Sequence, residues 1–213
     1  MKLTVKEIIE ACNGTLLCGK EETEISNVCI DSRKIEKGSL FVPIKGERTD
    51  AHKYIDSTFA AGAIATLTQE HLHMEDSHAW IRVNNTQEAL QKIASAYRAK
   101  FTLPIIGVTG SVGKTTTKEM IATALSSSKN VMKTKGNLNS QIGLPLTMFQ
   151  LLPEHEVAVI EMGMSDFGEM ARLSKIASPN YAVITNIGIS HIEQLHTKEN
   201  IRTEKLHITD SFN

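Results

Sequence analysis

The chain has 213 residues, of which 41% are hydrophobic and 22% charged, and its formal net charge is −1. This length allows two small domains, and a near-neutral charge without a basic stretch argues against a nucleic-acid-binding surface. No apolar run approaches the length of a membrane span, the N-terminus has no apolar signal core, and the three cysteines lack metal-binding spacing. We therefore expect a cytoplasmic protein with reduced thiols, no membrane insertion and no nucleic-acid partner.

The first hundred residues predict a small domain that mixes helices and strands. Apolar residues recur at helical spacing over 4–12, and Asn13-Gly14 ends this helix. Thr86 is the predicted N-cap of a long helix, and Pro104 follows that helix as a break. The other predicted elements are strands over 40–44, 63–67 and 79–83 and helices over 53–61 and 87–100.

The second half alternates strands and helices more regularly. This order predicts a parallel sheet with right-handed crossovers. The predicted fold class is α/β, with a small α/β domain over 1–101 and a phosphate-loop, parallel-sheet domain over 102–213. The predicted strands are 104–109, 130–134, 157–161 and 181–186, and the predicted helices are 114–126, 143–151, 166–177 and one that begins near 197.

The segment 104–120, PIIGVTGSVGKTTTKEM, dominates the second half. A short apolar strand leads into a glycine turn and then a helix, a geometry that presents backbone N–H groups to a phosphate. Lys114 supplies a positive charge, and the hydroxyl of Thr115 is a candidate Mg²⁺ ligand. Val108 stands where the general phosphate-loop pattern requires glycine, so the match is to the variant T-G-x-x-G-K-T-T. The alternative is a glycine turn that only joins a strand to a helix.

Polar residues also follow the other predicted strands of this half. Asn137 and Asn139 follow the second strand, Glu161 ends the third, and His191 follows the fourth. Ligands of parallel α/β sheets bind at the carboxyl ends of the strands, so these side chains are expected at the edge that holds the phosphate loop. Glu161 is the candidate acid near magnesium. The alternatives are that Glu161 caps the next helix and that His191 is an ordinary surface or core histidine.

Taken together, these motifs resemble the Mur ligase family, the ATP-dependent amide-forming enzymes of peptidoglycan precursor synthesis. The resemblance covers nearly the whole chain, and within the family it is strongest to ligases that add D-alanyl-D-alanine to UDP-N-acetylmuramoyl tripeptide. It rests on Asp31-Ser32-Arg33, Gly38–Arg48, Thr109–Glu119, Asn137–Thr147, Glu161–Met164 with Gly168–Met170, and Asn186–Gly188 with His191 and Glu193.

The resemblance implies ATP and Mg²⁺ as cofactors and a role for each matched position. Ser32 and Arg33 would contact the uridine diphosphate of the precursor, and Asn139 would face the muramoyl peptide. The implied ATP-binding residues are Gly110, Ser111, Val112, Gly113, Lys114, Thr115 and Thr116. The implied metal ligands are Thr115, Glu161, His191 and a carbamylated Lys205, and the implied catalytic residues are Lys114, Glu161, His191 and Lys205.

The implied reaction is a ligation through an acyl phosphate. The tripeptide carboxylate attacks the γ-phosphorus of ATP, and the amine of D-alanyl-D-alanine then displaces phosphate. Lys114 and magnesium would offset the charge that builds on the transferred phosphoryl group. An alternative for Lys205 is an ordinary solvated lysine on a terminal helix.

Four departures from the family pattern leave other functions open. They are Ser140, Gln194-Leu195-His196, His207, and the end of the chain at Asn213, where the central domain is expected to be incomplete and the C-terminal domain absent. One expectation is therefore a ligase fragment that turns over little by itself and self-associates through an uncovered sheet edge. The alternatives are a non-catalytic module that binds UDP-muramoyl peptide or nucleotide, and a related ligase that adds diaminopimelate or lysine.

Overall fold

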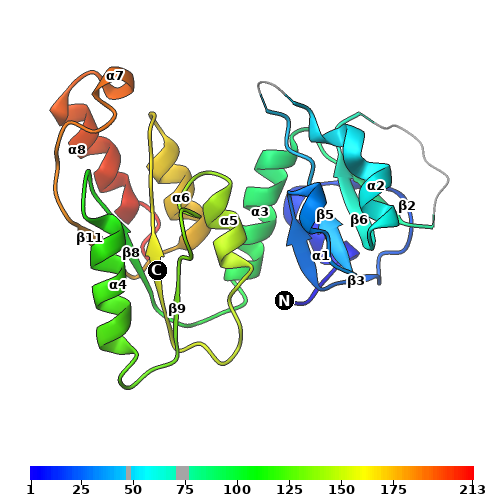
Figure 1. Cartoon of the computed structure of the whole chain (residues 1–213), viewed down its shortest axis with the longest axis horizontal. Helices are drawn as coiled ribbons and strands as arrows, with labels where there is room; N and C mark the ends of the chain where they lie inside the picture. The colour runs from blue at the N-terminus through cyan, green and yellow to red at the C-terminus, as the bar shows by residue number, and fades with distance from the viewer. Residues whose placement is uncertain (47–48, 71–76) are drawn as a thin grey trace. The chain divides into compact units, whose positions relative to one another are not determined.

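The computed structural model describes residues 1–46, 49–70 and 77–213, which form two compact units, Met1–Tyr97 (unit 1) and Arg98–Asn213 (unit 2). In Figure 1 unit 1 is coloured blue to green and unit 2 green to red. Glu47 and Arg48, which belong to one of the sequence motifs, lie outside the described residues. Among those residues, no helix combines the length and apolar character that a membrane crossing requires.

Unit 1 is built on a five-stranded sheet of order β2-β7-β6-β5-β4, in which only β2 runs antiparallel to its neighbour. A second, two-stranded antiparallel sheet pairs β1 with β3. A core cluster joins Phe41, Ile55, Ala63 and Trp80. The strands are β1 Leu3–Thr4, β2 Thr15–Cys18, β3 Glu24–Ile25, β4 Asn27–Cys29, β5 Ser39–Phe41, β6 Ala63–Thr68 and β7 Ala79–Arg82. The helices are α1 Val5–Cys12, α2 Ile55–Ala60, α3 Thr86–Arg98 and the 3₁₀ turns η1 Ser32–Lys34 and η2 Ala51–Tyr54.

The predicted end of the first helix is confirmed, whereas the predicted cap of the long helix is wrong. Asn13 ends α1 in the left-handed conformation, at φ 55°. The cap of α3 is Asn85, whose side-chain oxygen accepts hydrogen bonds from the N–H groups of Gln87 (2.9 Å) and Glu88 (3.0 Å). Thr86 instead donates its hydroxyl to the carbonyl of Pro43 at 2.6 Å. Asn85 and Thr86 are both residue types that favour the N-cap position. Asn85 takes that position because the hydroxyl of Thr86 is bonded to the carbonyl of Pro43.

Unit 2 contains the predicted parallel sheet, in the order β11-β8-β10-β9. Its strands are β8 Ile105–Thr109, β9 Val131–Lys133, β10 Val157–Glu161 and β11 Tyr181–Ile184. Its helices are α4 Lys114–Leu125, α5 Gly143–Met148, α6 Glu169–Ala177, α7 Ile192–Leu195, α8 Lys198–Leu206 and the 3₁₀ turn η3 His207–Thr209. The register pairs Val108 with Glu161 on the two central strands. The residues that follow β8 and β10 therefore lie beside each other.

A buried arginine, Arg98, donates hydrogen bonds to backbone carbonyls of unit 2. Arg98 is 4% exposed, and its guanidinium donates to the carbonyls of Ala177 (2.9 Å) and Phe101 (2.6 Å). Longer contacts of 3.4 Å reach the carbonyls of Leu103 and Ser178. Burial lowers the pKa of Arg98 from its ordinary value. The side chain thus satisfies carbonyls at the C-terminus of α6 and in the segment that leads into β8.

Candidate functional site

The phosphate loop, Gly110–Thr116, connects the carboxyl end of β8 to α4 (Figure 1). Gly110 and Gly113 have φ values of 145° and 84°, which favour glycine. A Cβ atom on Gly110 would also collide with the hydroxyl of Thr185. Gly113 precedes α4 without a side-chain cap, so the N–H groups in the first turn of this 12-residue helix point toward a potential anion.

The loop is held from the β11 side. The N–H of Ser111 donates to the backbone carbonyl of Asn186 (3.1 Å), and the N–H of Val112 donates to its side-chain oxygen (3.2 Å). Thr185 donates to the carbonyl of Val112 at 2.6 Å, and Gly188 donates its N–H to the hydroxyl of Ser111 at 2.9 Å. Two of the expected phosphate-binding N–H groups are therefore occupied by Asn186 in this conformation. The first turn of α4 offers the others.

Lys114, Thr115, Glu161 and Asn139 meet at the same edge of the sheet. Lys114 is half-buried and donates its ammonium group to the carbonyl of Gly110 at 2.8 Å. Glu161 is 3% exposed and accepts hydrogen bonds from the hydroxyl of Thr115 (2.9 Å) and the amide of Asn139 (2.7 Å). The predicted gathering of these side chains is thus seen in the structure.

Glu161 does not cap the next helix, as one alternative held. Another carboxylate takes that place, because Glu204 of α8 accepts hydrogen bonds from the N–H groups of Gly168 (3.0 Å) and Met170 (2.9 Å) at the start of α6. The carboxylate of Glu161 instead contacts Thr115 of the phosphate loop.

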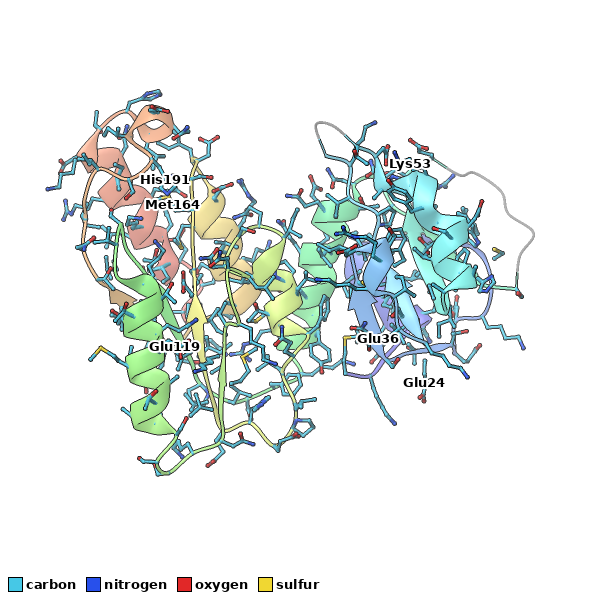
Figure 2. The ribbon with its side chains drawn as sticks, in the orientation of Figure 1. Glu24, Glu36, Lys53, Glu119, Met164 and His191 are labelled. Atoms are coloured by element: carbon cyan, nitrogen blue, oxygen red, sulfur yellow. The ribbon has the colours of Figure 1, made fainter. Side chains whose placement is uncertain are left out.

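A buried ion network that the sequence did not predict lies behind Glu161. Lys118 is 2% exposed, and its ammonium group lies 3.9 Å from Glu161 Oε2 and 3.1 Å from Glu119 Oε1. It also donates to the carbonyl of Thr134 at 2.8 Å. Glu119, labelled in Figure 2, pairs with Lys133 as well, and both lysines lower the pKa of its carboxyl. In the sequence, Lys118 and Glu119 stand one turn after Thr115, but this position does not by itself indicate that the Lys118 side chain is buried.

His191 and Lys205 lie near Lys114. His191, labelled in Figure 2, has a left-handed backbone (φ 64°) at the start of α7, and its pKa is lowered by partial burial and by the charges of Lys205 and Lys114. Lys205 is 2% exposed. Burial, followed by the charge of Lys114, lowers the pKa of Lys205 to about 8, and Glu204 opposes this shift. A solvated surface lysine is therefore ruled out at this position.

Ser32 and Arg33 lie in unit 1. They occupy the 3₁₀ turn η1, which Asp31 caps by accepting the N–H of Arg33 at 3.1 Å. Arg33 also pairs side-on with Asp31, at 2.8 Å from Nε to Oδ1 and 2.9 Å from Nη2 to Oδ2. Hydrogen bonds from Arg33 lower the pKa of Asp31 to about 2. The guanidinium is 85% exposed and pairs with Asp31 through Nε and Nη2, so its other N–H groups can reach a phosphate or a carbonyl.

The oxygen atoms beside the phosphate loop fit Mg²⁺ better than a transition metal. The described residues contain no group of three or more His, Cys, Asp and Glu side chains that could hold a metal ion. The hydroxyl of Thr115 and a carboxylate oxygen of Glu161 lie 2.9 Å apart at the start of α4. One or two such oxygens, completed by phosphate oxygens and water, form the usual protein site for Mg²⁺.

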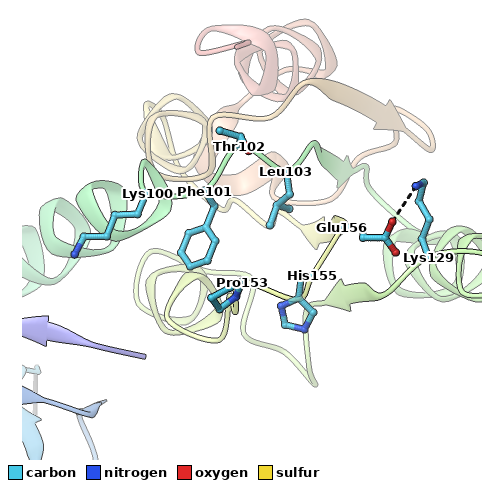
Figure 3. Close-up of a pocket in the computed structure, with 8 residues that line it drawn as sticks. All are labelled: Lys100, Phe101, Thr102, Leu103, Lys129, Pro153, His155 and Glu156. Carbon is cyan, nitrogen blue, oxygen red and sulfur yellow. Dashed lines mark hydrogen bonds and ion pairs between the residues drawn. The ribbon is translucent and has the colours of Figure 1, made fainter.

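A pocket of about 530 Å³ lies at the other edge of the same sheet (Figure 3). Its lining residues precede strands β8, β9 and β10, whereas the phosphate loop follows β8, so this pocket is separate from the candidate site. A pair between Lys129 and Glu156 at 3.3 Å lies in its wall. The lining residues are Lys100, Phe101, Thr102, Leu103, Lys129, Pro153, His155 and Glu156.

Comparisons with known proteins agree along both units. Residues 24–98 match the Mur ligase family, catalytic domain, and residues 108–213 match the Mur ligase middle domain. The chain is 47% identical over its full length to the UDP-N-acetylmuramoyl-tripeptide--D-alanyl-D-alanine ligase of Bacillus subtilis, and this match spans 47% of that protein. The ligase of the same name from Escherichia coli is 37% identical over 91% of this chain and 42% of its own length.

Solved structures give the same result. A crystal structure of MurF from Acinetobacter baumannii matches the whole chain with a TM-score of 0.93 and 33% identity, over 47% of that protein. MurF ligase from Thermotoga maritima in complex with ADP matches 88% of this chain with a TM-score of 0.81 and 35% identity, over 43% of its own length. The chain therefore spans about half the length of the relatives it matches.

Proposed function

Because this chain belongs to the Mur ligase family, we propose that it holds the precursor and the nucleotide in an ADP-forming ligase that adds D-alanyl-D-alanine to UDP-N-acetylmuramoyl tripeptide. The observation that carries this proposal is the contact of Thr115 and Asn139 with the buried carboxylate of Glu161, directly beside the phosphate loop. The ligase relatives named above and the ADP complex of a similar structure support the same substrates and nucleotide. Because ATP is a cytoplasmic metabolite, we place the reaction in the cytoplasm.

Each part of the nucleotide site has a defined task in this proposal. The first turn of α4 donates N–H groups to the ATP phosphates, and Lys114 exchanges its contact with the Gly110 carbonyl for a phosphate oxygen. Thr115 and Glu161 would hold one Mg²⁺, which when bound would supply positive charge that polarises the phosphoryl group. In unit 1, Ser32 and Arg33 bind the uridine diphosphate of the precursor, while Asn139 faces its peptide.

Lys205 has the properties that carbamylation requires. A pKa of about 8 leaves about a quarter of its side chains as the free amine at pH 7.5. The free amine, formed when the ammonium group gives one proton to solvent, attacks carbon dioxide through its nitrogen and loses a second proton to solvent. The cationic side chain thus becomes a carbamate anion. The product bears oxygen ligands beside His191, and together they would hold a second Mg²⁺. Carbamylation thereby gives the buried Lys205 side chain a function as a metal ligand.

The reaction needs no protein nucleophile. A carboxylate oxygen of the tripeptide attacks the γ-phosphorus of ATP, the bond to the β-phosphate oxygen breaks, and an acyl phosphate and ADP result. The amine of D-alanyl-D-alanine attacks the acyl carbon, and the tetrahedral intermediate loses phosphate and a proton to leave an amide. Lys114 offsets the negative charge in the first step, and the fixed loop backbone holds the phosphates in line.

The proposal can be tested by replacing the matching first part of the Bacillus subtilis ligase with this chain. The hybrid protein is incubated with ATP, Mg²⁺, UDP-N-acetylmuramoyl tripeptide and D-alanyl-D-alanine, and the amide product is measured by mass spectrometry. We expect product in the complete mixture, loss of product in the Lys114→Ala hybrid, and normal turnover in a Lys129→Ala hybrid. A folded hybrid that binds ATP but forms no amide would contradict the proposed function.

A further inference from the structure

Lys118 is the feature of this site that the proposed roles leave unexplained. It lies one turn after Thr115 on α4, and its side chain is 2% exposed. A buried ammonium group has a large desolvation cost unless its donors and its charge are satisfied. The closest partners of Lys118 are the Thr134 carbonyl and Glu119, and one carboxylate of the nucleotide site, Glu161, lies 3.9 Å from its ammonium group.

The ammonium group of Lys118 connects the ends of three neighbouring strands. It extends from the helix that follows β8, donates to the Thr134 carbonyl directly after β9 at 2.8 Å, and lies 3.9 Å from Glu161 Oε2 at the end of β10. The N–H of Glu161 in turn donates to the hydroxyl of Thr134 at 2.9 Å. The remaining charge partner, Glu119, contacts Lys118 at 3.1 Å from the outer side.

These contacts restrict the carboxylate from several directions. Asn139 holds Glu161 Oε1 at 2.7 Å, whereas Oε2 lies between the hydroxyl of Thr115 and the ammonium group of Lys118. The same lysine fixes the backbone of Thr134, from which the chain continues to Asn139. Lys118 thus positions both the carboxylate and the segment that supplies its amide partner.

We propose that Lys118 is a positioning residue that orients Glu161 for Mg²⁺-dependent nucleotide binding. This inference rests on the proposed function, since it assigns Glu161 to the metal. Lys118 would not contact nucleotide or metal. Its effect passes through the carboxylate and the Thr134 backbone.

A positioning role and a simple charge effect predict opposite changes in Mg²⁺-dependent binding when Lys118 is removed. A lysine that acted only as a neighbouring positive charge would repel Mg²⁺, and its removal would strengthen Mg²⁺-dependent binding. A lysine that orients the metal-facing carboxylate strengthens that binding, and its removal would weaken it. A lysine that only stabilises the fold would affect binding equally with and without the metal.

The test is titration calorimetry of ATP into the purified chain, with MgCl₂ and separately with EDTA. The measured quantity is the ratio of the two dissociation constants. For Lys118→Met we expect the Mg²⁺-dependent gain in affinity to fall by at least about tenfold, the usual size of an effect on a metal ligand's partner. The affinity in EDTA is expected to stay within about twofold.

Two further variants complete the design. Lys118→Gln keeps a donor for the Thr134 carbonyl without the charge, so it should preserve the fold and show the same loss. Lys129→Met removes a lysine paired with Glu156 at the other edge of the sheet (Figure 3) and should keep the wild-type ratio.

An unchanged or increased Mg²⁺ effect in Lys118→Gln, or an equal loss with and without metal, would overturn the inference. Failure of the wild-type chain to bind ATP more tightly with Mg²⁺ is a different outcome. It would refute the proposed function itself.

Discussion

Replacement of Arg98 by methionine should strongly destabilise unit 2. The substitution keeps much of the apolar stem but leaves the buried carbonyl of Ala177 and the half-buried carbonyl of Phe101 without the donors that now lie 2.9 and 2.6 Å away. Hydrogen bonds from a charged donor contribute about 1.5–3 kcal/mol each, so the gross loss is roughly 3–6 kcal/mol. Relief from burying the guanidinium offsets part of this loss. We expect a net decrease of about 3 kcal/mol in the free energy of unfolding.

The assay must report on unit 2 separately, because the single tryptophan, Trp80, lies in unit 1. Hydrogen exchange of the α6 amides, followed by mass spectrometry as a function of urea concentration, gives the free energy of opening of this unit. Arg202→Met is the matched control. The Arg202 side chain is 62% exposed and forms an exposed ion pair with Glu199, so the cost of this substitution should stay below about 0.5 kcal/mol. A loss in Arg98→Met as small as in the control would refute the reasoning.

Two further predictions concern the phosphate loop and its lysine neighbours. Gly110→Ala places a side chain at φ 145° and against the Thr185 hydroxyl, so we expect a loss of about 2–4 kcal/mol in urea unfolding, against about 1 kcal/mol for Gly136→Ala, whose added Cβ meets no atom. Equal losses would show that the loop backbone tolerates a side chain. The pKa of Lys205 is about 8 in the folded chain, against an ordinary value of 10.5. Between these two pH values the unfolded chain binds more protons than the folded chain, so the free energy of unfolding should rise with pH by roughly 3 kcal/mol. Lys205→Met should remove that rise in urea unfolding from pH 7.5 to 10 in buffer free of carbon dioxide, and an unchanged slope in the variant would contradict the assignment.

The parallel sheet and the central site could be predicted from sequence because each depends on local patterns. Apolar strands alternate with helices, and polar residues end or follow each strand of unit 2, so the geometry of a parallel sheet places Glu161 near the phosphate loop. The contact of Glu161 with Thr115 confirms that placement. Glu161 lies there because it pairs in register with Val108, which stands just before the phosphate loop.

Other features depend on contacts between distant segments and left little trace in the sequence. The short strands β1 to β4 have two to four residues each, too few for a periodic pattern. The burial of Lys118 depends on Thr134 and Glu161, which are distant in sequence. The role of Asn186 in holding Ser111 and Val112 likewise requires β11 to lie beside β8. A polar residue that follows a strand therefore predicts that its side chain lies at the carboxyl edge of the sheet, but it does not predict which residue that side chain contacts.

The central claim is that Thr115 and Glu161 form the metal side of an ATP site at the phosphate loop. Its most direct test is the dissociation constant of ATP with MgCl₂ for the wild-type chain and for Glu161→Gln, with Glu156→Gln as a control at the other edge of the sheet. Loss of one charge-assisted ligand contact of about 2 kcal/mol predicts binding roughly 30-fold weaker in Glu161→Gln, and wild-type binding in the control. Wild-type affinity for ATP with MgCl₂ in a folded Glu161→Gln variant would contradict the account.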